Sequence, residues 1–171
     1  MGEMTAQEQQ AWMQAAAPNE HHETFKPMVG TWNAVVKLWM DPAGEPQEAT
    51  GQMVNSMVLG GRFIEHDYKG QSFGMEFLGK GFFGFDNTAG QYEGLWIDTT
   101  STQMQAETGN YDPATKTFNM IGEVTCPSSG ETIKKRSVIR IIDDNAHTME
   151  MFFVGPDGSE FKSMEISYTR A

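Results

Sequence analysis

The sequence predicts an all-β fold, a roughly ten-stranded antiparallel meander that follows a short N-terminal helical segment. From Thr31 onward, apolar and polar residues alternate with period two in short runs, as they do in strands with one buried face. Stretches rich in Gly, Pro, Asn and Asp separate these runs every ~8 to 14 positions, which is typical of hairpin turns. Such a meander either splits into a sandwich or closes into an up-and-down barrel, and closure removes the exposed strand edges.

Helix signals are confined to the N-terminal part of the chain. Residues 5–17 are rich in Ala and Gln, and Thr5 and Glu8 have the spacing of a capping box, so a short helix ended by a proline is expected there. We therefore expect a helical arm over residues 1–24 and a single barrel domain over residues 25–171.

A second helical turn is expected just before the first strand, with Phe25 and Met28 facing the core. A short isolated helix is marginal in water. The first helix should therefore be held in place only if Trp12 and Met13 dock on the open mouth of the barrel or on a second subunit. The second case leaves a homodimer open.

The expected strands are joined by short connections, so neighbours should pair as hairpins. They run over residues 31–40, 48–58, 62–69, 73–86, 91–98, 102–109, 116–125, 131–142, 147–154 and 159–169. One face of several strands is apolar and should point inward. These residues are Trp32, Ala34, Val36, Leu38 and Met40 in the first strand, Phe73, Met75, Phe77, Gly79, Gly81, Phe83 and Phe85 in the fourth, and His147, Met149, Met151 and Phe153 in the ninth.

Charge and composition exclude several classes of partner. The chain has 12 Lys and Arg against 23 Asp and Glu and a net charge of -11, which repels nucleic acid and anionic membranes. The single cysteine, Cys126, excludes an internal disulfide. The N-terminus does not have the pattern of a signal peptide, and no run approaches the ~18 apolar residues of a membrane span. We expect a cytoplasmic protein.

Several motifs resemble those of known barrel families. Gly30-Thr31-Trp32 opens the first strand, and Arg170 lies one residue from the C-terminus. This pair resembles the Gly-x-Trp motif of lipocalins and fatty-acid-binding proteins, in which the Trp plugs the closed end of the barrel and an Arg of the last strand stacks across it.

A longer set of motifs resembles DUF1579, a bacterial family of unknown function assigned to the calycin, lipocalin-like barrels. In order, the motifs are GTW, LGGRFIEHDYKG, GKGFFGFDNTAGQYEGLWIDTTST, GNYDPATKTF and YTR. The resemblance runs from about Phe25 to Arg170. It implies a lipocalin-like barrel in which Trp32 meets Arg170 at the closed end, and it implies no reaction.

The predicted interior is rich in methionine and phenylalanine, of which the chain has 13 and 11. Methionine fills gaps in plain cores and also lines adaptable apolar pockets. We expect a non-catalytic protein that binds a small apolar or amphipathic molecule in a cavity lined by Phe83, Met149 and Met151. The alternatives are a structural or protein-interaction module whose barrel is filled by its own side chains, and a haem-binding or enzymatic barrel.

Polar candidates for the site lie on the third expected strand. Arg62, His66 and Tyr68 share one face, and Glu65 and Asp67 share the other. We expect the first three to point into the barrel and the two acids to point outward. The alternative is that this stretch is only a hairpin whose polar side chains have no binding role.

Trp96 and Asp98 share one face of the fifth expected strand and are followed by the hydroxyl residues 99–101. They could hold the polar head of a ligand, and we expect Asp98 to pair with Arg62, because a buried arginine needs a partner. The alternative is a local turn in which Asp98 binds backbone amides.

Motifs of common enzymes and metal sites are absent from the sequence. There is no G-x-S-x-G elbow, no P-loop and no His or Cys cluster with zinc-ligand spacing. No catalytic residue, metal or cofactor is therefore predicted. His147 beside Met149 and Met151 keeps haem ligation open as the weaker alternative.

Overall fold

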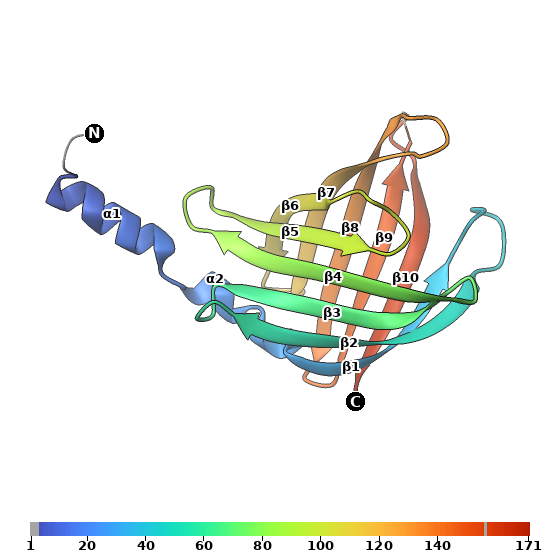
Figure 1. Cartoon of the computed structure of the whole chain (residues 1–171), viewed down its shortest axis with the longest axis horizontal. Helices are drawn as coiled ribbons and strands as arrows, with labels where there is room; N and C mark the ends of the chain where they lie inside the picture. The colour runs from blue at the N-terminus through green and yellow to red at the C-terminus, as the bar shows by residue number, and fades with distance from the viewer. Residues whose placement is uncertain (1–3, 156) are drawn as a thin grey trace.

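A computed structural model describes residues 4–155 and 157–171, and these residues form one closed barrel (Figure 1). The strands are β1 (Gly30–Leu38), β2 (Gln47–Val58), β3 (Phe63–Ser72), β4 (Met75–Asp86), β5 (Gln91–Asp98), β6 (Gln105–Asp112), β7 (Thr117–Thr125), β8 (Thr132–Asp143), β9 (Ala146–Val154) and β10 (Glu160–Arg170). Each strand pairs antiparallel with its neighbours in sequence, and β1 pairs with β10 to close the sheet. The predicted up-and-down barrel is confirmed.

The helical elements precede the barrel. They are α1 (Ala6–Ala16), α2 (Glu20–Glu23) and the single 3-10 turn η1 (Lys26–Met28). The capping box of Thr5 and Glu8 is formed as expected. None of the helices among the described residues is both long and apolar enough to span a membrane.

The first helix projects away from the barrel (Figure 1). Its C-terminal carbonyls are held by two side chains of the barrel: Asn87 donates to the carbonyl of Ala17, and Arg62 donates to that of Ala16, each at 2.8 Å. Trp12 remains 69% exposed, and α1 buries none of its residues. The helix does not lie over the open mouth, and its docking on a second subunit stays a prediction.

Side chains of the segment from α2 to η1 plug one end of the barrel. Phe25 and Met28 are buried there, as predicted, against Ile64, Phe118 and other members of one apolar cluster. The β2–β3, β4–β5, β6–β7 and β8–β9 connections also lie at this closed end. The opposite, open end carries connections that include β1–β2, β3–β4, β5–β6 and β7–β8.

The predicted contact at the closed end is present. The guanidinium carbon of Arg170 lies 4.2 Å from the ring centre of Trp32, which is fully buried. The same guanidinium donates to the carbonyls of Val29 at 3.0 Å and Asp144 at 2.7 Å. A cation–π contact and backbone hydrogen bonds therefore fasten the last strand to the segment that enters the barrel.

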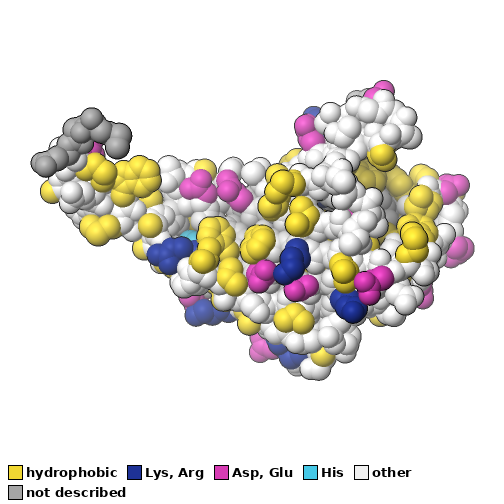
Figure 2. Space-filling view, in the orientation of Figure 1, with side chains coloured by type: hydrophobic (Ala, Val, Ile, Leu, Met, Phe, Trp, Pro, Cys, Tyr) yellow, Lys and Arg dark blue, Asp and Glu magenta, His cyan; other side chains and the backbone are white. Residues whose placement is uncertain are grey.

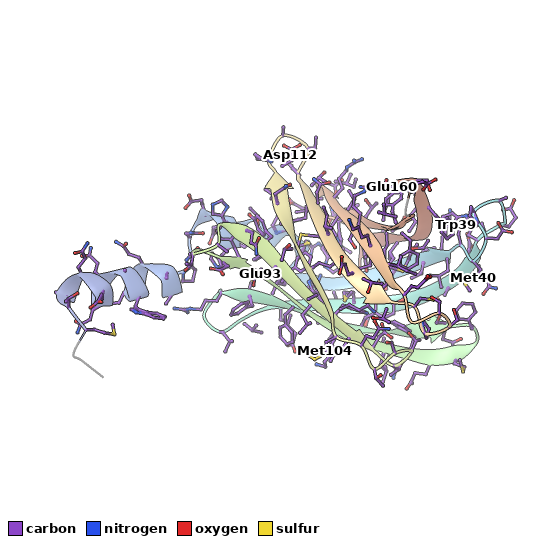
Figure 3. The ribbon with its side chains drawn as sticks, turned by 90° about the horizontal axis from the view of Figure 1, so that it is seen from above. Trp39, Met40, Glu93, Met104, Asp112 and Glu160 are labelled. Atoms are coloured by element: carbon purple, nitrogen blue, oxygen red, sulfur yellow. The ribbon has the colours of Figure 1, made fainter. Side chains whose placement is uncertain are left out.

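Two details of the predicted strands are wrong. Met40 lies beyond the end of β1 and Met75 is the first residue of β4, and both are exposed rather than inward-facing. Phe73, in the β3–β4 turn, is also exposed, but it lines the open end of the barrel interior. In Figure 3, Met40 and Trp39 lie at the end of the barrel opposite α1. The alternation of apolar and polar residues cannot locate the last residue of a strand, because the same pattern can extend by one or two residues into the hairpin turn.

The sixth strand was expected at 102–109 and is found at Gln105–Asp112. Local hydrogen bonds of hydroxyl groups hold the preceding residues in a loop, since Ser101 Oγ accepts from the backbone N–H of Gln103 at 3.0 Å. The residues Asn110 and Tyr111, which look like a turn, instead pair with β7.

Candidate functional site

The barrel encloses a cavity of about 900 Å³ that extends from the plug at Met28 to the open end. This volume lies well above the ~300 Å³ at which small-molecule pockets begin. A recess walled by apolar side chains is visible on the right of Figure 2. The apolar lining consists mainly of Val36, Leu38, Met53, Phe77, Phe83, Ile139, Met149, Met151, Phe153, Met164 and Ile166.

Most of the residues predicted for the site line this cavity. They are His66, Tyr68, Phe83, Trp96, Asp98, Met149 and Met151. The face of β3 that carries His66 and Tyr68 therefore points into the barrel, as predicted. The acids of its outer face, Glu65 and Asp67, lie near Lys80 on β4 at 3.4 Å and 3.2 Å. Binding of a ligand by the lining residues stays a prediction.

Arg62 is the exception, and its predicted place in the cavity is wrong. It precedes the first residue of β3 and follows a turn in which Leu59, Gly60 and Gly61 have positive φ. The turn directs the guanidinium outward, where it donates to the carbonyls of Ala16 at 2.8 Å and Leu59 at 3.0 Å. Arg62 thus anchors α1.

The predicted ion pair between Arg62 and Asp98 is consequently absent. Asp98 instead accepts a hydrogen bond from Trp96 Nε1 at 2.9 Å and one from the backbone N–H of Thr100 at 2.8 Å. The local-turn interpretation of Asp98 is correct, and the side chain still lines the cavity. Its bond to the indole fixes Trp96 against the cavity wall.

The indole of Trp96 lies flat over β4 because the residues opposite it have no side chains. A Cβ atom at Gly79 would lie 2.2 Å from the indole, and one at Gly81 would lie 2.8 Å from it. Glycine at these positions thus widens the barrel interior where a large aromatic ring must fit.

The deep part of the cavity, next to the plug, carries neutral polar groups. His66 Nδ1 lies 2.7 Å from the side-chain oxygen of Asn55, whose amide donates to the carbonyl of Met28 at 2.9 Å. His147 is only 5% exposed and stacks on Tyr168 with ring centres 4.4 Å apart. Among the described residues, His147 Nδ1 is the one buried side-chain nitrogen or oxygen without a hydrogen-bond partner. Such an atom is costly to leave unsatisfied.

Burial sets the charge state of both histidines. It lowers the pKa of His66 from 6.5 to about 4. The pKa of His147 is also lowered to about 4, by burial first and then by the charges of His66 and Arg170. Both imidazoles are therefore neutral near neutral pH, and each offers one donor and one acceptor.

This environment makes a testable prediction about acid stability. Below pH 6.5 the histidines of the unfolded chain bind protons, whereas the buried histidines of the folded protein stay neutral. The free energy of unfolding therefore falls as the pH drops from 6.5 to about 4. For His147 the loss is about 3 kcal/mol, at ~1.4 kcal/mol per pKa unit. An NMR titration of the histidine ring protons, assigned with His66→Gln and His147→Gln variants, should show both rings titrating near pH 4. Titration of either ring at its ordinary pKa would contradict the assignment.

A charged cluster on the cavity wall was missed by sequence reasoning. The Lys135 Nζ atom lies 2.8 Å from Glu107 Oε1, and the two side chains are only 5% and 10% exposed. Lys135 also donates to Gln105 Oε1 at 2.9 Å, and Ser137 donates to Glu107 Oε1 at 2.7 Å. Lys135, Glu107 and Gln105 all line the cavity.

The two charged residues meet because the residue between them is Gly122. Glu107 on β6 pairs with Gly122 on β7, which pairs with Lys135 on β8. A Cβ atom at Gly122 would lie 2.4 Å from the Ala106 carbonyl oxygen and 2.9 Å from Cγ of Glu107. One signal could have revealed Lys135, since it shares the inward face of its strand with Ser137 and Ile139.

The described residues hold no group of three or more His, Cys, Asp or Glu side chains placed to bind a metal ion. Cys126 lies at the open end, where hydrogen bonds from Ser128 and then Ser129 lower its pKa from 9.0 to about 6. The sequence contains no neighbouring base that predicts this shift, and hydroxyl donors in the turn produce it.

Comparison with known protein families assigns the chain to one of them. A family described as a protein of unknown function (DUF1579) matches residues 17–170. The chain belongs to this family. The resemblance expected from the motifs is thus confirmed, and the DUF1579 match extends further toward the N-terminus to include α2. None of the curated protein sequences compared with the chain matches it.

Solved structures share the fold of this DUF1579 barrel at low sequence identity. Rv2717c from M. tuberculosis is similar with a TM-score of 0.66 and 12% identity, over 91% of this chain and 99% of that chain. An S-type phycobiliprotein lyase, CPES from Guillardia theta, is similar with a TM-score of 0.58 and 10% identity, over 94% and 96% of the two chains. At such identities the likeness concerns the fold alone.

Proposed function

We propose that the protein binds a small amphipathic molecule inside the barrel. The observation that supports this most is the cavity of about 900 Å³, whose lining is apolar over most of its length and polar at defined places. Ligand pockets are typically of this size and combine an apolar wall with a few placed polar groups. The methionines in the wall suit a ligand of irregular shape, because their side chains adapt to what they contact.

The cavity also bears on the alternative of a barrel filled by its own side chains. Phe25, Ile64 and Phe118 fill the closed end, but the region around Met149 and Met151 is lined rather than filled. A structural module gains nothing from an empty interior, since each unfilled volume in a core lowers stability. The open interior therefore favours a binding function.

The neutral fluorescent dye Nile red tests this function. It should bind the protein with one-to-one stoichiometry and blue-shifted emission, because the cavity is apolar. Met151→Trp fills part of the cavity and should weaken dye binding about tenfold. The control Ile121→Trp makes an equally large substitution on the outer surface, at a side chain that is 60% exposed, and should leave the affinity unchanged. Equal affinities of the two variants would contradict the proposal.

A further inference from the structure

The buried pair of Lys135 and Glu107 still has hydrogen-bonding capacity toward the cavity. A lysine ammonium has three donors. Two of those of Lys135 are directed to Glu107 Oε1 and Gln105 Oε1. In the part of the chain that the structure describes, Lys135 and Ser137 both bond to Oε1 of Glu107, which leaves Oε2 as an acceptor. The pair can therefore offer a ligand one N–H group and one carboxylate oxygen.

The opposite charges of this pair select against charged ligands. A carboxylate that approaches Lys135 also approaches Glu107, so attraction and repulsion act over similar distances and largely cancel. Asp98 on the same cavity wall and the net charge of -11 add to the repulsion of anions. A cationic group is repelled by Lys135 in the same way, and both carboxylate oxygens of Asp98 already accept hydrogen bonds from Trp96 and Thr100. A neutral group that accepts from Nζ and donates to the carboxylate is complementary to both.

The rest of the cavity has the same character. His66 and His147, in its deep part, are uncharged imidazoles with a donor and an acceptor each. His147 Nδ1 is buried and unpartnered among the described residues, which points to a hydrogen-bonding group that the protein itself does not supply. No polar region of the cavity thus presents an excess of positive charge to hold an anion.

We propose that the ligand is a neutral amphipathic molecule whose polar end carries both a hydrogen-bond donor and an acceptor, as an amide or an alcohol does. Lys135 and Glu107 bind that end, while the methionine and phenylalanine side chains bind the apolar body. This inference rests on the proposed function and specifies the ligand class for the same cavity.

Three probes with one alkyl chain and different heads test the inference: decanamide, decanoate and decyltrimethylammonium. Calorimetry at neutral pH should show decanamide binding about tenfold more tightly than the two charged probes. Equal affinities for the three probes would overturn this inference and leave the proposed function standing. Absence of binding for all three would overturn both.

A charge variant makes the test sharper. Glu107→Gln preserves the shape of the side chain and leaves the charge of Lys135 uncompensated, so it should raise the affinity for decanoate about tenfold. The control Glu123→Gln makes the same change at an exposed position on β7 and should have no effect. If Glu107→Gln and Glu123→Gln bind each probe with the same affinity, the pair of Lys135 and Glu107 does not discriminate between head groups, and the inference is wrong.

A second variant covers the case in which Glu107→Gln does not fold. Lys135→Met combined with Glu107→Leu removes both charges and keeps side chains of similar size. This double variant should lose the preference for decanamide over the charged probes. A preference that persists in it would overturn the role assigned to the pair.

Discussion

Replacing Trp32 by alanine is expected to lower the free energy of unfolding by about 3 to 5 kcal/mol, the range for large aromatic residues removed from cores. Trp32 is fully buried, its Nε1 donates to the Met28 carbonyl at 2.7 Å, and its ring packs edge-on against His147 at 4.4 Å. The substitution therefore removes core volume, the Arg170 contact and a hydrogen bond together. Denaturant unfolding followed by circular dichroism measures the loss.

The control for this experiment is Trp12→Ala, which removes the same side chain from an exposed site on α1. It should change the free energy of unfolding by less than about 0.5 kcal/mol, as substitutions on a surface usually do. Similar values for the two variants would show that Trp32 does not hold the closed end together.

The second large effect is expected at the buried ion pair. Lys135→Met leaves the Glu107 carboxylate without its charged partner in the cavity wall, and such a substitution typically costs about 3 to 5 kcal/mol. The double variant with Glu107→Leu should recover most of this loss, because two apolar side chains pack without a desolvation cost. A double-mutant cycle of unfolding free energies measures the coupling.

Additive losses in this cycle would contradict the account, since they would mean that Lys135 and Glu107 do not interact in solution. Lys134→Met is the matched control, because Lys134 is the neighbouring, exposed lysine of the same strand. Its substitution should change the stability little.

Much of the fold could be predicted because the strands follow a simple rule. In β9 the alternation of His147, Met149 and Met151 with Thr148 and Glu150 sets the inward face, and the structure has His147, Met149, Met151 and Phe153 on the cavity side. The contact between Trp32 and Arg170 was expected from motifs at the two ends of the chain. The pairing of β1 with β10 places these residues directly opposite each other.

The error at Arg62 has a physical cause. The alternation of side chains applies only inside a strand, and Arg62 lies one residue before β3, after a turn with positive φ values. The same rule gave correct positions for His66 and Tyr68, which lie inside that strand. A partner such as the Ala16 carbonyl could not be predicted, because it depends on how the arm returns to the barrel.

The pair of Lys135 and Glu107 shows a different limit. The residues lie far apart in the sequence and on strands that are not neighbours, so their contact depends on barrel register and on the missing side chain of Gly122. Alternation could place Lys135 inside the barrel. It could not identify Glu107 as its partner.

The central claim is that the barrel holds a small molecule, and native mass spectrometry of protein purified gently from its own cells tests it most directly. We predict a one-to-one complex with a small organic molecule that is released on denaturation, together with a loss of this complex in Met151→Trp. The bare polypeptide mass in all charge states of the native wild-type protein would contradict the claim.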